Sequence, residues 1–196
     1  MGHLMSTLIL ASTSVYRRAL LERLRIPFQC LAPHTDESPL AHETPSALAI
    51  RLAQAKAQAI ANMHPQAWVI GSDQVVDCQG QLLGKPGNHE RAVAQLQSMR
   101  GQVVKFHTAV CVMAPDFCEV RNVITEVLFK NLSDATIESY LRAEEPYDCA
   151  GSAKSEGLGI SLLEYIRSDD PTALVGLPLI TTLQLLKQSG FPLPLQ

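Results

Sequence analysis

The sequence predicts a mixed α/β fold, and three observations support this. Apolar runs of strand type alternate with helical patterns over the first half of the chain. A long pair of strand-like segments follows, and one further helical pattern lies near the end. Alternating strands and helices favour parallel neighbours in a sheet, whereas two strands joined by a short turn favour an antiparallel pair. We therefore expect one mixed sheet covered by helices.

The first half of the chain contains three such alternations. In its helical segments, leucine or alanine recurs at spacings of three and four, which is typical of an amphipathic helix. Proline and serine at positions 45 and 46 mark a helix start. We expect strands at 6–11, 28–33 and 67–76 and helices at 14–24, 46–63 and 89–99.

The second half opens with the two long strand-like segments, which we expect to form a hairpin that turns near Pro115 and Asp116. Ser133 is the expected N-cap of the next helix, because a serine side chain accepts a hydrogen bond from the first helical turn. The expected strands lie at 102–114 and 118–130, and the expected helices at 133–144 and 178–190.

Composition narrows the class of protein. The chain has 196 residues, a net charge of −3 and 46% hydrophobic residues, which is enough for a substantial core. It contains no apolar run of the ~20 residues that a membrane span needs and no signal-peptide pattern. The five cysteines are scattered and form no C-x-x-C pair, which favours a reducing cytoplasm over a disulfide framework or a zinc site. Without a basic excess, binding to a nucleic acid polymer is disfavoured.

The domain organisation is expected to be simple. Residues 1–4, with the sequence MGHL before a second methionine, look like an expression scar. No linker is long enough to separate two independent domains, so we expect residues 5–196 to form a single domain, with room for two lobes.

Ser12, Ser14 and two arginines stand where the first strand turns into the first helix. A helix N-terminus attracts anions, and hydroxyls add donors there. The leucine stripe places Arg17 on the inward face and Arg18 on the polar face. Ser12, Ser14 and Arg17 are therefore expected to form an anion pocket, with Arg18 solvated. The alternative is an N-cap serine beside a surface arginine.

Two lysines are further candidates. Lys56 stands between Leu52 and Ile60 at spacings of four, at the margin of an apolar helix face. A lysine there either extends its ammonium to solvent or holds a phosphate over the core. Lys85 lies on a GKPG turn and by itself would be solvated. A P-loop is excluded because Pro86 stands where the motif needs serine or threonine.

Two acidic positions complete the pattern. Asp73 comes directly after an apolar strand, and the ends of strands form the ligand crevice in open α/β sheets. Glu37, next to Asp36, lies in the loop after the second strand. A triphosphate needs a divalent cation, and Mg²⁺ takes carboxylate oxygen and water. One carboxylate for the metal and another for activating water would complete such a site; the alternative is that these loop acids are simply solvated.

Seven segments in order resemble the Maf family of nucleotide pyrophosphatases. They are LILASTSVYRR, DES, RLAQAKA, GSDQVV, GKP, CAGSAKSEGLG and LVGLPL, and they span the chain from about Leu8 to Leu186. The resemblance implies a fold like that of the inosine-triphosphate pyrophosphatases, with a mixed twisted sheet in two lobes and a central nucleotide cleft. It also implies hydrolysis of a nucleoside triphosphate to the monophosphate and pyrophosphate, with a divalent metal cation (Mg²⁺ or Mn²⁺) as cofactor, and it is compatible with a homodimer.

The family's motif positions carry over to residues already singled out. The S-x-S-x-x-R motif falls on Ser12, Ser14 and Arg17, and the motif lysines fall on Lys56 and Lys85. The motif acids fall on Glu37 and Asp73, with Asp73 as general base. The resemblance thus implies phosphate binding by Ser12, Ser14, Arg17 and Lys85, catalysis by Asp73, Glu37 and Lys56, and metal binding by Glu37 and Asp73.

Three positions distinguish branches of the family. Tyr16, Gln74 and Glu156 resemble the branch that hydrolyses 7-methyl-GTP, whereas the branch acting on dTTP and UTP has Arg, Thr and Gln there. A methylated guanine is cationic and attracts an aromatic face. A carboxylate accepts hydrogen bonds from the two N–H groups on guanine's Watson–Crick edge and is repelled by the carbonyls of thymine and uracil. Tyr16 stands where close relatives often have Trp, and its alternative role is core packing.

Several alternatives stay open. The same chemistry on dTTP or UTP is one, and a non-catalytic nucleotide-binding regulator of cell division is another. The motif alone leaves open whether Lys154 contacts phosphate or only lines its loop. It also leaves open which modified purine nucleotide is the physiological substrate.

Overall fold

The computed structural model describes residues 7–193. The expected expression scar at residues 1–4 lies outside this range. Within the described residues, seven strands form one mixed sheet in the order β2-β1-β3-β5-β6-β7, with β4 paired to β3. The strands are β1 (Leu8–Ala11), β2 (Gln29–Leu31), β3 (Trp68–Cys78), β4 (Gln81–Leu83), β5 (Val103–Ala114), β6 (Phe117–Phe129) and β7 (Leu163–Arg167). The helices are α1 (Val15–Glu22), α2 (Pro45–Ala61), α3 (His89–Met99), α4 (Asp134–Glu144) and α5 (Leu179–Gln188).

Parallel and antiparallel pairing both occur in the sheet. β1 pairs in parallel with β2 and β3, as the alternation of strands and helices predicts. β4 pairs antiparallel with β3, and β7 pairs antiparallel with β6. β5 and β6 are neighbours joined only by Pro115 and Asp116, which confirms the expected hairpin. The expectation of a mixed sheet is therefore confirmed.

The chain divides into two compact units, each built from discontinuous segments. Of the described residues, the first comprises 7–73, 108–123 and 170–193. The second comprises Gln74–His107 and Ile124–Asp169.

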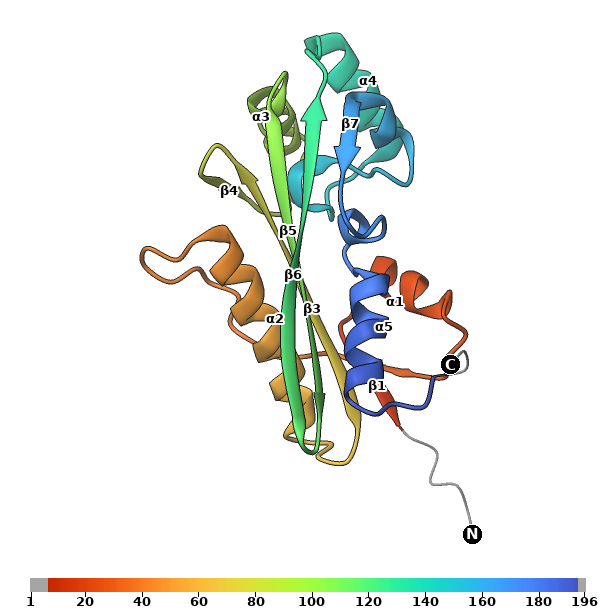
Figure 1. The fold of residues 1–196 in the computed structure, drawn as a ribbon. Helices are drawn as coiled ribbons and strands as arrows, with labels where there is room; N and C mark the ends of the chain where they lie inside the picture. The colour runs from red at the N-terminus through yellow and green to blue at the C-terminus, as the bar shows by residue number, and fades with distance from the viewer. Residues whose placement is uncertain (1–6, 194–196) are drawn as a thin grey trace. The chain divides into compact units, whose positions relative to one another are not determined.

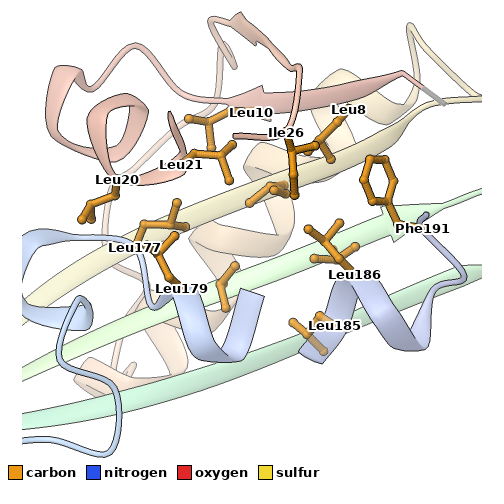
Figure 2. Close-up of a cluster of buried hydrophobic side chains, with 13 residues drawn as sticks. Leu8, Leu10, Leu20, Leu21, Ile26, Leu177, Leu179, Leu185, Leu186 and Phe191 are labelled. Atoms are coloured by element: carbon orange, nitrogen blue, oxygen red, sulfur yellow. The ribbon is translucent and has the colours of Figure 1, made fainter. Parts of the chain in front are cut away.

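The first unit has a leucine-rich core between α1, α5 and the sheet (Figure 2). Alternate residues of a strand face opposite sides of the sheet, so Leu8 and Leu10 of β1 and Ile70 of β3 share one face. On that face they meet Leu20 and Leu21 of α1 and the apolar side of α5. The remaining buried members of this cluster are Ile26, Val110, Val112, Leu177, Leu179, Leu185, Leu186 and Phe191.

Helix α2 packs on the opposite face of β3 (Figure 1). The contact is close at Gly71, where an added Cβ would lie 2.2 Å from the carbonyl oxygen of Ala53 and 2.6 Å from the backbone nitrogen of Ala57. Only a residue without a side chain allows this approach. Because Asp73 is two residues further along the strand, it faces the same helix as Gly71.

The second unit is built around α3 and α4. Ser133 is the N-cap of α4, as predicted, and its side-chain oxygen accepts a hydrogen bond from the backbone N–H of Thr136. Arg100, just after α3, forms an ion pair with Asp134 in the first turn of α4. β7 lies at the edge of the sheet beside β6.

The observed helices and long strands match the expected segments to within about three residues at their ends. Two short strands, β4 and β7, were not expected, nor were the 3₁₀ turns at 150–152, 158–162 and 173–175. Among the described helices, none combines the length and the apolar character that a membrane crossing requires.

Candidate active site

The centre of the candidate site is a buried lysine between two carboxylates. The Nζ atom of Lys56 on α2 lies 2.6 Å from Oδ1 of Asp73 on β3 and 2.6 Å from Oε1 of Glu37 in the β2–α2 loop. The side chains of Lys56 and Asp73 are only 7% and 9% exposed, whereas that of Glu37 is 60% exposed. Lys56 therefore does not extend its ammonium to solvent, and the three residues that the sequence singled out separately are in direct contact.

Burial and charge act in opposite directions on these groups. Burial raises the pKa of Asp73 above its ordinary value, while the cations of Lys56 and Arg17 favour the carboxylate and Glu37 opposes it. Burial also lowers the pKa of Arg17, against the attraction of Asp73 and Glu37. Arg17 is thus electrostatically coupled to both carboxylates, and the cluster holds two cations and two anions.

Arg17 is held by the loop that precedes α5. Its Nε donates to the carbonyl oxygen of Gly176 at 2.8 Å, and the same oxygen accepts from the hydroxyl of Ser72 at 3.0 Å. Gly176 has a φ of 120°, which favours glycine, and an added Cβ there would lie 3.6 Å from Nε of Arg17. Arg18 is mostly exposed and forms an ion pair with Glu22 at 3.0 Å. The assignment of Arg17 to the inner face and Arg18 to the polar face is confirmed.

The two serines organise the start of α1. Ser14 is the N-cap, and its Oγ accepts from the backbone N–H of Arg17 at 3.4 Å. Oγ of buried Ser12 accepts from the backbone N–H of Ser14 at 3.1 Å. Both oxygens are used as acceptors of main-chain hydrogen bonds, which leaves their O–H groups as donors. The capping role of Ser14 is observed, and the binding of an anion by both serines stays a prediction.

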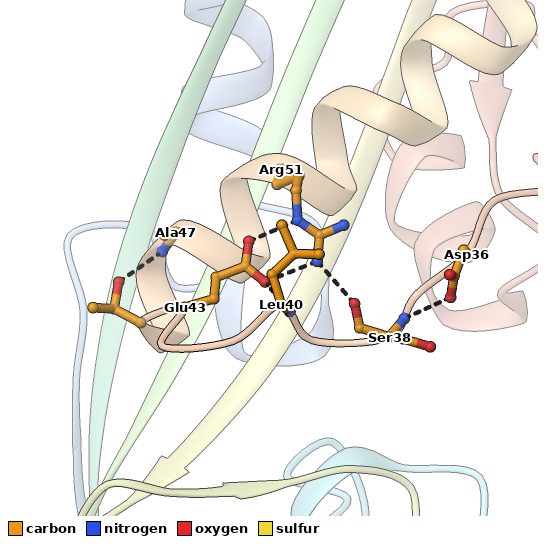
Figure 3. Close-up of polar contacts among 7 residues, drawn as sticks. Asp36, Ser38, Leu40, Glu43, Ala47 and Arg51 are labelled. Atoms are coloured by element: carbon orange, nitrogen blue, oxygen red, sulfur yellow. Dashed lines mark hydrogen bonds and ion pairs between the residues drawn. The ribbon is translucent and has the colours of Figure 1, made fainter.

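A set of polar contacts fixes the loop that carries Glu37 (Figure 3). Arg51 of α2 donates from Nε to Oε1 of Glu43 at 2.6 Å and from Nη2 to Oε2 of Glu43 at 2.8 Å. Its Nη2 also donates to the carbonyl oxygen of Ser38 at 3.0 Å. Oδ1 of Asp36 accepts from the backbone N–H of Ser38 at 2.9 Å. The RLAQAKA motif includes Arg51, but sequence reasoning assigned it no role.

Tyr16 lies in the first unit, and the other predicted specificity residues lie in the second. Tyr16 is half-buried on α1 and is not among the buried residues of the core cluster. Gln74 is half-buried on β3, and Glu156 is exposed in the segment after α4. Lys85 is exposed on the turn after β4, where the carbonyl oxygen of Gly84 accepts from Nε2 of Gln95 at 3.0 Å.

The segment that carries Glu156 is braced by an ion pair. Nζ of Lys154 lies 2.8 Å from Oε1 of Glu144, and Oε2 of Glu144 accepts from the backbone N–H of Leu158 at 2.8 Å. An added Cβ on Gly157 would lie 2.7 Å from that Oε2. The contact with Glu144 raises the pKa of Lys154. Lys154 therefore pairs with a carboxylate within its own unit, and sequence reasoning missed Glu144.

The carboxylate oxygens of the cluster are suited to a Mg²⁺ or Mn²⁺ ion whose remaining ligands are water and substrate phosphate. Among residues 7–193, no group of three or more His, Cys, Asp or Glu side chains is arranged to hold a metal. Glu37 and Asp73 nevertheless converge on one point, and Mg²⁺ is commonly bound by one or two carboxylates, with water and substrate phosphate as the other ligands. The residues fit such an ion and do not fit a closed zinc site.

A hollow of about 640 Å³ elsewhere in the first unit has different chemistry. Its lining includes Gln58, Asn62, Met113, Phe117 and Cys118, and Asp116 is its charged side chain. None of the predicted site residues lines it. A nucleotide triphosphate would meet a carboxylate there and no lysine or arginine, so this hollow is not the candidate site.

Comparison with known proteins agrees with the motif pattern. A family model described as Maf-like protein matches residues 7–189. The chain belongs to the Maf family. The match includes every candidate site residue, since they extend from Ser12 to Glu156.

Close relatives of this Maf chain carry a specific name. A protein of Polaromonas sp. (strain JS666), named 7-methyl-GTP pyrophosphatase, is 61% identical over 188 residues, covering 95% of this chain and 86% of that protein. A protein of Albidiferax ferrireducens with the same name is 61% identical over 185 residues, covering 93% of each. Among solved structures, the Ham1 protein of Staphylococcus aureus matches with a TM-score of 0.46 at 14% identity, covering 64% of this chain and 73% of that one.

Proposed function

We propose that this Maf chain hydrolyses 7-methyl-GTP to 7-methyl-GMP and pyrophosphate, removing a modified nucleotide before a polymerase uses it. The observation that carries the proposal is the buried contact of Lys56 with Asp73 and Glu37, next to Arg17. Buried charges are costly to desolvate, and clusters of them with perturbed pKa values are enriched at functional sites. The names of relatives at 61% identity support the choice of substrate.

The proposed reaction is a displacement by water at the α-phosphorus. Asp73 orients a water molecule and takes its proton as the new bond between oxygen and phosphorus forms. The bond from the α-phosphorus to the bridging oxygen breaks, and pyrophosphate leaves with the electron pair. Arg17, Lys56 and Lys85 bind the phosphates, and Ser12 and Ser14 donate from their hydroxyls. Positioned cations of this kind stabilise the charge that moves to the leaving group.

Glu37 and Asp73 would hold the divalent cation. When bound, Mg²⁺ or Mn²⁺ supplies electrostatic neutralisation of the phosphate oxygens. Lys56 lies between the same two carboxylates and keeps them close together despite their like charge. Its ammonium therefore keeps the two carboxylates together at the place where a divalent cation would bind.

Base selection is assigned to Tyr16, Gln74 and Glu156. An aromatic ring attracts the cationic methylated guanine by about 0.5–2 kcal/mol. A carboxylate that accepts two hydrogen bonds from guanine contributes about 1–3 kcal/mol of discrimination against the wrong base. We also propose a cytoplasmic location, because all five cysteines lie among the described residues and none of them is in a disulfide. A homodimer stays a prediction.

The test is pyrophosphate release with Mg²⁺ or Mn²⁺ over a panel of 7-methyl-GTP, GTP, dTTP and UTP. We expect 7-methyl-GTP to have the highest kcat/KM and Asp73→Asn to lose at least 100-fold in kcat while it still binds the nucleotide. A preference for dTTP or UTP would reassign the substrate and overturn the roles given to Tyr16, Gln74 and Glu156. Binding without any release by the native chain would favour a regulator.

A further inference from the structure

The loop that carries Glu37 is attached to α2 at two neighbouring points. Lys56 contacts the carboxylate of Glu37 at 2.6 Å, and Arg51, five residues earlier on the same helix, contacts the carbonyl oxygen of Ser38 at 3.0 Å. Asp36 accepts from the backbone N–H of Ser38 at 2.9 Å. Residues 36–38 therefore form a local turn, which is bonded to α2 through Glu37 and Ser38.

The geometry at Arg51 needs an arginine. Nε and Nη2 bind the two oxygens of Glu43 at 2.6 and 2.8 Å, while Nη2 also binds Ser38. Oε2 of Glu43 in turn accepts from the backbone N–H of Leu40 at 3.0 Å, so the carboxylate is bonded to both the helix and the loop. A planar guanidinium supplies this fork of donors, and a lysine ammonium does not reproduce it.

The contact is partly shielded from solvent. The Glu43 side chain is 8% exposed and that of Arg51 is 31% exposed. Arg51 lowers the pKa of Glu43 to about 2, so this carboxylate stays ionised across the pH range in which the enzyme would work. Exposed single-contact ion pairs contribute little, but the two parallel hydrogen bonds of a bidentate pair fix the geometry of both side chains.

We propose that Arg51 is a positioning residue for the reaction, and that it holds the Glu37 loop so that the Glu37 carboxylate meets Lys56 and Asp73. This inference rests on the proposed role of Glu37 in hydrolysis. Arg51 contacts no reacting atom and acts through the loop. A misplacement of about 1 Å in a catalytic group can lower a rate by about 100-fold, so a loop contact of this kind is sufficient to matter.

The test is a kinetic cycle of Arg51→Met, Glu37→Gln and the double variant, on whichever nucleotide the native enzyme hydrolyses best. Arg51→Met is expected to lower kcat by about 10- to 100-fold with KM changed less than threefold. The kcat of the double variant is expected to match that of Glu37→Gln within about threefold. Arg51 acts through the Glu37 carboxylate, so its removal has no further effect once that carboxylate is gone. The kcat of Arg51→Lys should lie within about threefold of that of Arg51→Met, because an ammonium does not reproduce the fork of donors.

A measurement without substrate follows the loop itself. In Arg51→Met, hydrogen exchange at the amides of Ser38 and Leu40 should become at least tenfold faster. The matched control is Arg121→Met, which removes an equally exposed arginine that pairs with Glu119 at 2.7 Å in the same unit. It should leave kcat and the exchange of the Ser38 and Leu40 amides unchanged. If Arg51→Met does not fold, Glu43→Gln replaces it in the same cycle.

Three outcomes would each overturn the inference. One is full additivity, in which the double variant loses the product of both single effects. Another is unchanged hydrogen exchange in the loop, since Arg51 would then not hold it. The third is recovery of kcat in Arg51→Lys, since a positive charge alone would then be sufficient. Failure of the proposed function is distinct: it appears as a substrate other than 7-methyl-GTP in the native enzyme, and the cycle is then read on that substrate.

Discussion

Lys56 is the residue on which the candidate site depends most, because its buried ammonium satisfies two carboxylates at once. Asp73 is buried beside it, and Glu37 approaches it from the exposed side. In a region of low polarity, an unpaired charge costs several kcal/mol, whereas a paired one is tolerated. Removal of either member of the Lys56–Asp73 pair should therefore lower the free energy of unfolding by more than the ion pair itself contributes to it.

We predict that Lys56→Met and Asp73→Asn each lower the free energy of unfolding by about 3 kcal/mol, because each leaves a buried charge without a partner that contacts it at 2.6 Å. The double variant should be less destabilised than the sum by about 1–3 kcal/mol, since neither charge then remains. Urea unfolding of the four proteins measures this coupling. Additive losses would mean that the two groups do not stabilise each other.

A second prediction concerns pH and the loop contact of Glu43. Its pKa is lowered to about 2, chiefly by Arg51, from an unfolded value of about 4.3. A lowered pKa in the folded state stabilises the protein above about pH 4.3, and this contribution disappears as the pH falls toward 2. The difference in unfolding free energy between the native chain and Glu43→Gln should be constant above pH 5 and shrink steadily below pH 4. A difference that does not vary with pH would contradict the assignment.

The positions of some residues in and around the candidate site could be predicted from the local sequence pattern, and those of others could not. Arg17 and Arg18 are adjacent, yet the leucine stripe of α1 separates them correctly, because a helix fixes the direction of each side chain. Arg51 and Glu144 were missed because their partners lie in irregular loops. The approach of Ser38 to Arg51 depends on a loop path that no periodic pattern describes.

At the scale of elements, the packing of α2 against β3 sets the geometry of the site. α2 carries Arg51 and Lys56, and β3 carries Asp73. The distance between helix and strand is set at Gly71, where the backbone of Ala53 leaves no space for a Cβ. A change of this one contact should therefore be transmitted to the Lys56–Asp73 ion pair.

We predict that Gly71→Ala destabilises the protein by about 1–3 kcal/mol through overpacking and lowers kcat at least tenfold. Ala57→Gly should not rescue it, because the shortest contact, 2.2 Å, is with the backbone oxygen of Ala53. Gly84→Ala is the stability control, since its added Cβ meets nothing within 4 Å. Urea unfolding and steady-state kinetics measure the two effects. Full rescue by Ala57→Gly would contradict the prediction that the backbone of Ala53 limits the approach.

The brace at the end of α4 leads to a prediction about selectivity. Glu144 binds Lys154 and the backbone N–H of Leu158 and so shapes the segment that carries Glu156. Glu144→Gln should reduce the ratio of kcat/KM for 7-methyl-GTP over dTTP by about tenfold, because Glu156 loses its fixed position. Glu164→Gln, on exposed β7, serves as control. If Glu144→Gln leaves the ratio of the two kcat/KM values unchanged, the contacts of Glu144 have no role in base recognition.

The elements that sequence patterns missed are short. β4 has three residues and β7 has five, and neither is long enough for period-two alternation to stand out. β7 exists because it pairs with β6 over Glu126–Phe129, and its formation depends on a partner far away in the sequence. The helices, in contrast, were predicted to within a turn because eight or more residues repeat the same spacing.

At the scale of the whole molecule, net charge does not assist nucleotide binding. The chain has a net charge of −3 and its proposed substrate is a polyanion, so there is no long-range electrostatic attraction between protein and substrate. We therefore expect the local cations Arg17, Lys56 and Lys85 to provide the electrostatic part of the affinity. Two lobes were expected, but the boundaries of the two units could not be read from the sequence, because each unit is assembled from separate segments and no linker marks the change.

Ligand binding to the folded state raises the stability of the whole molecule, which allows the substrate class to be tested without turnover. In Asp73→Asn, 7-methyl-GTP at about 100 times its dissociation constant should stabilise the protein by about 2.7 kcal/mol, which corresponds to a rise in Tm of about 5–10 °C. Measured by thermal unfolding at equal concentration, dTTP should produce a smaller rise, because a carboxylate at position 156 repels its carbonyls. Replacement of Glu156 by Gln should reduce the difference between the two nucleotides. A larger rise with dTTP than with 7-methyl-GTP would show that these residues select a pyrimidine.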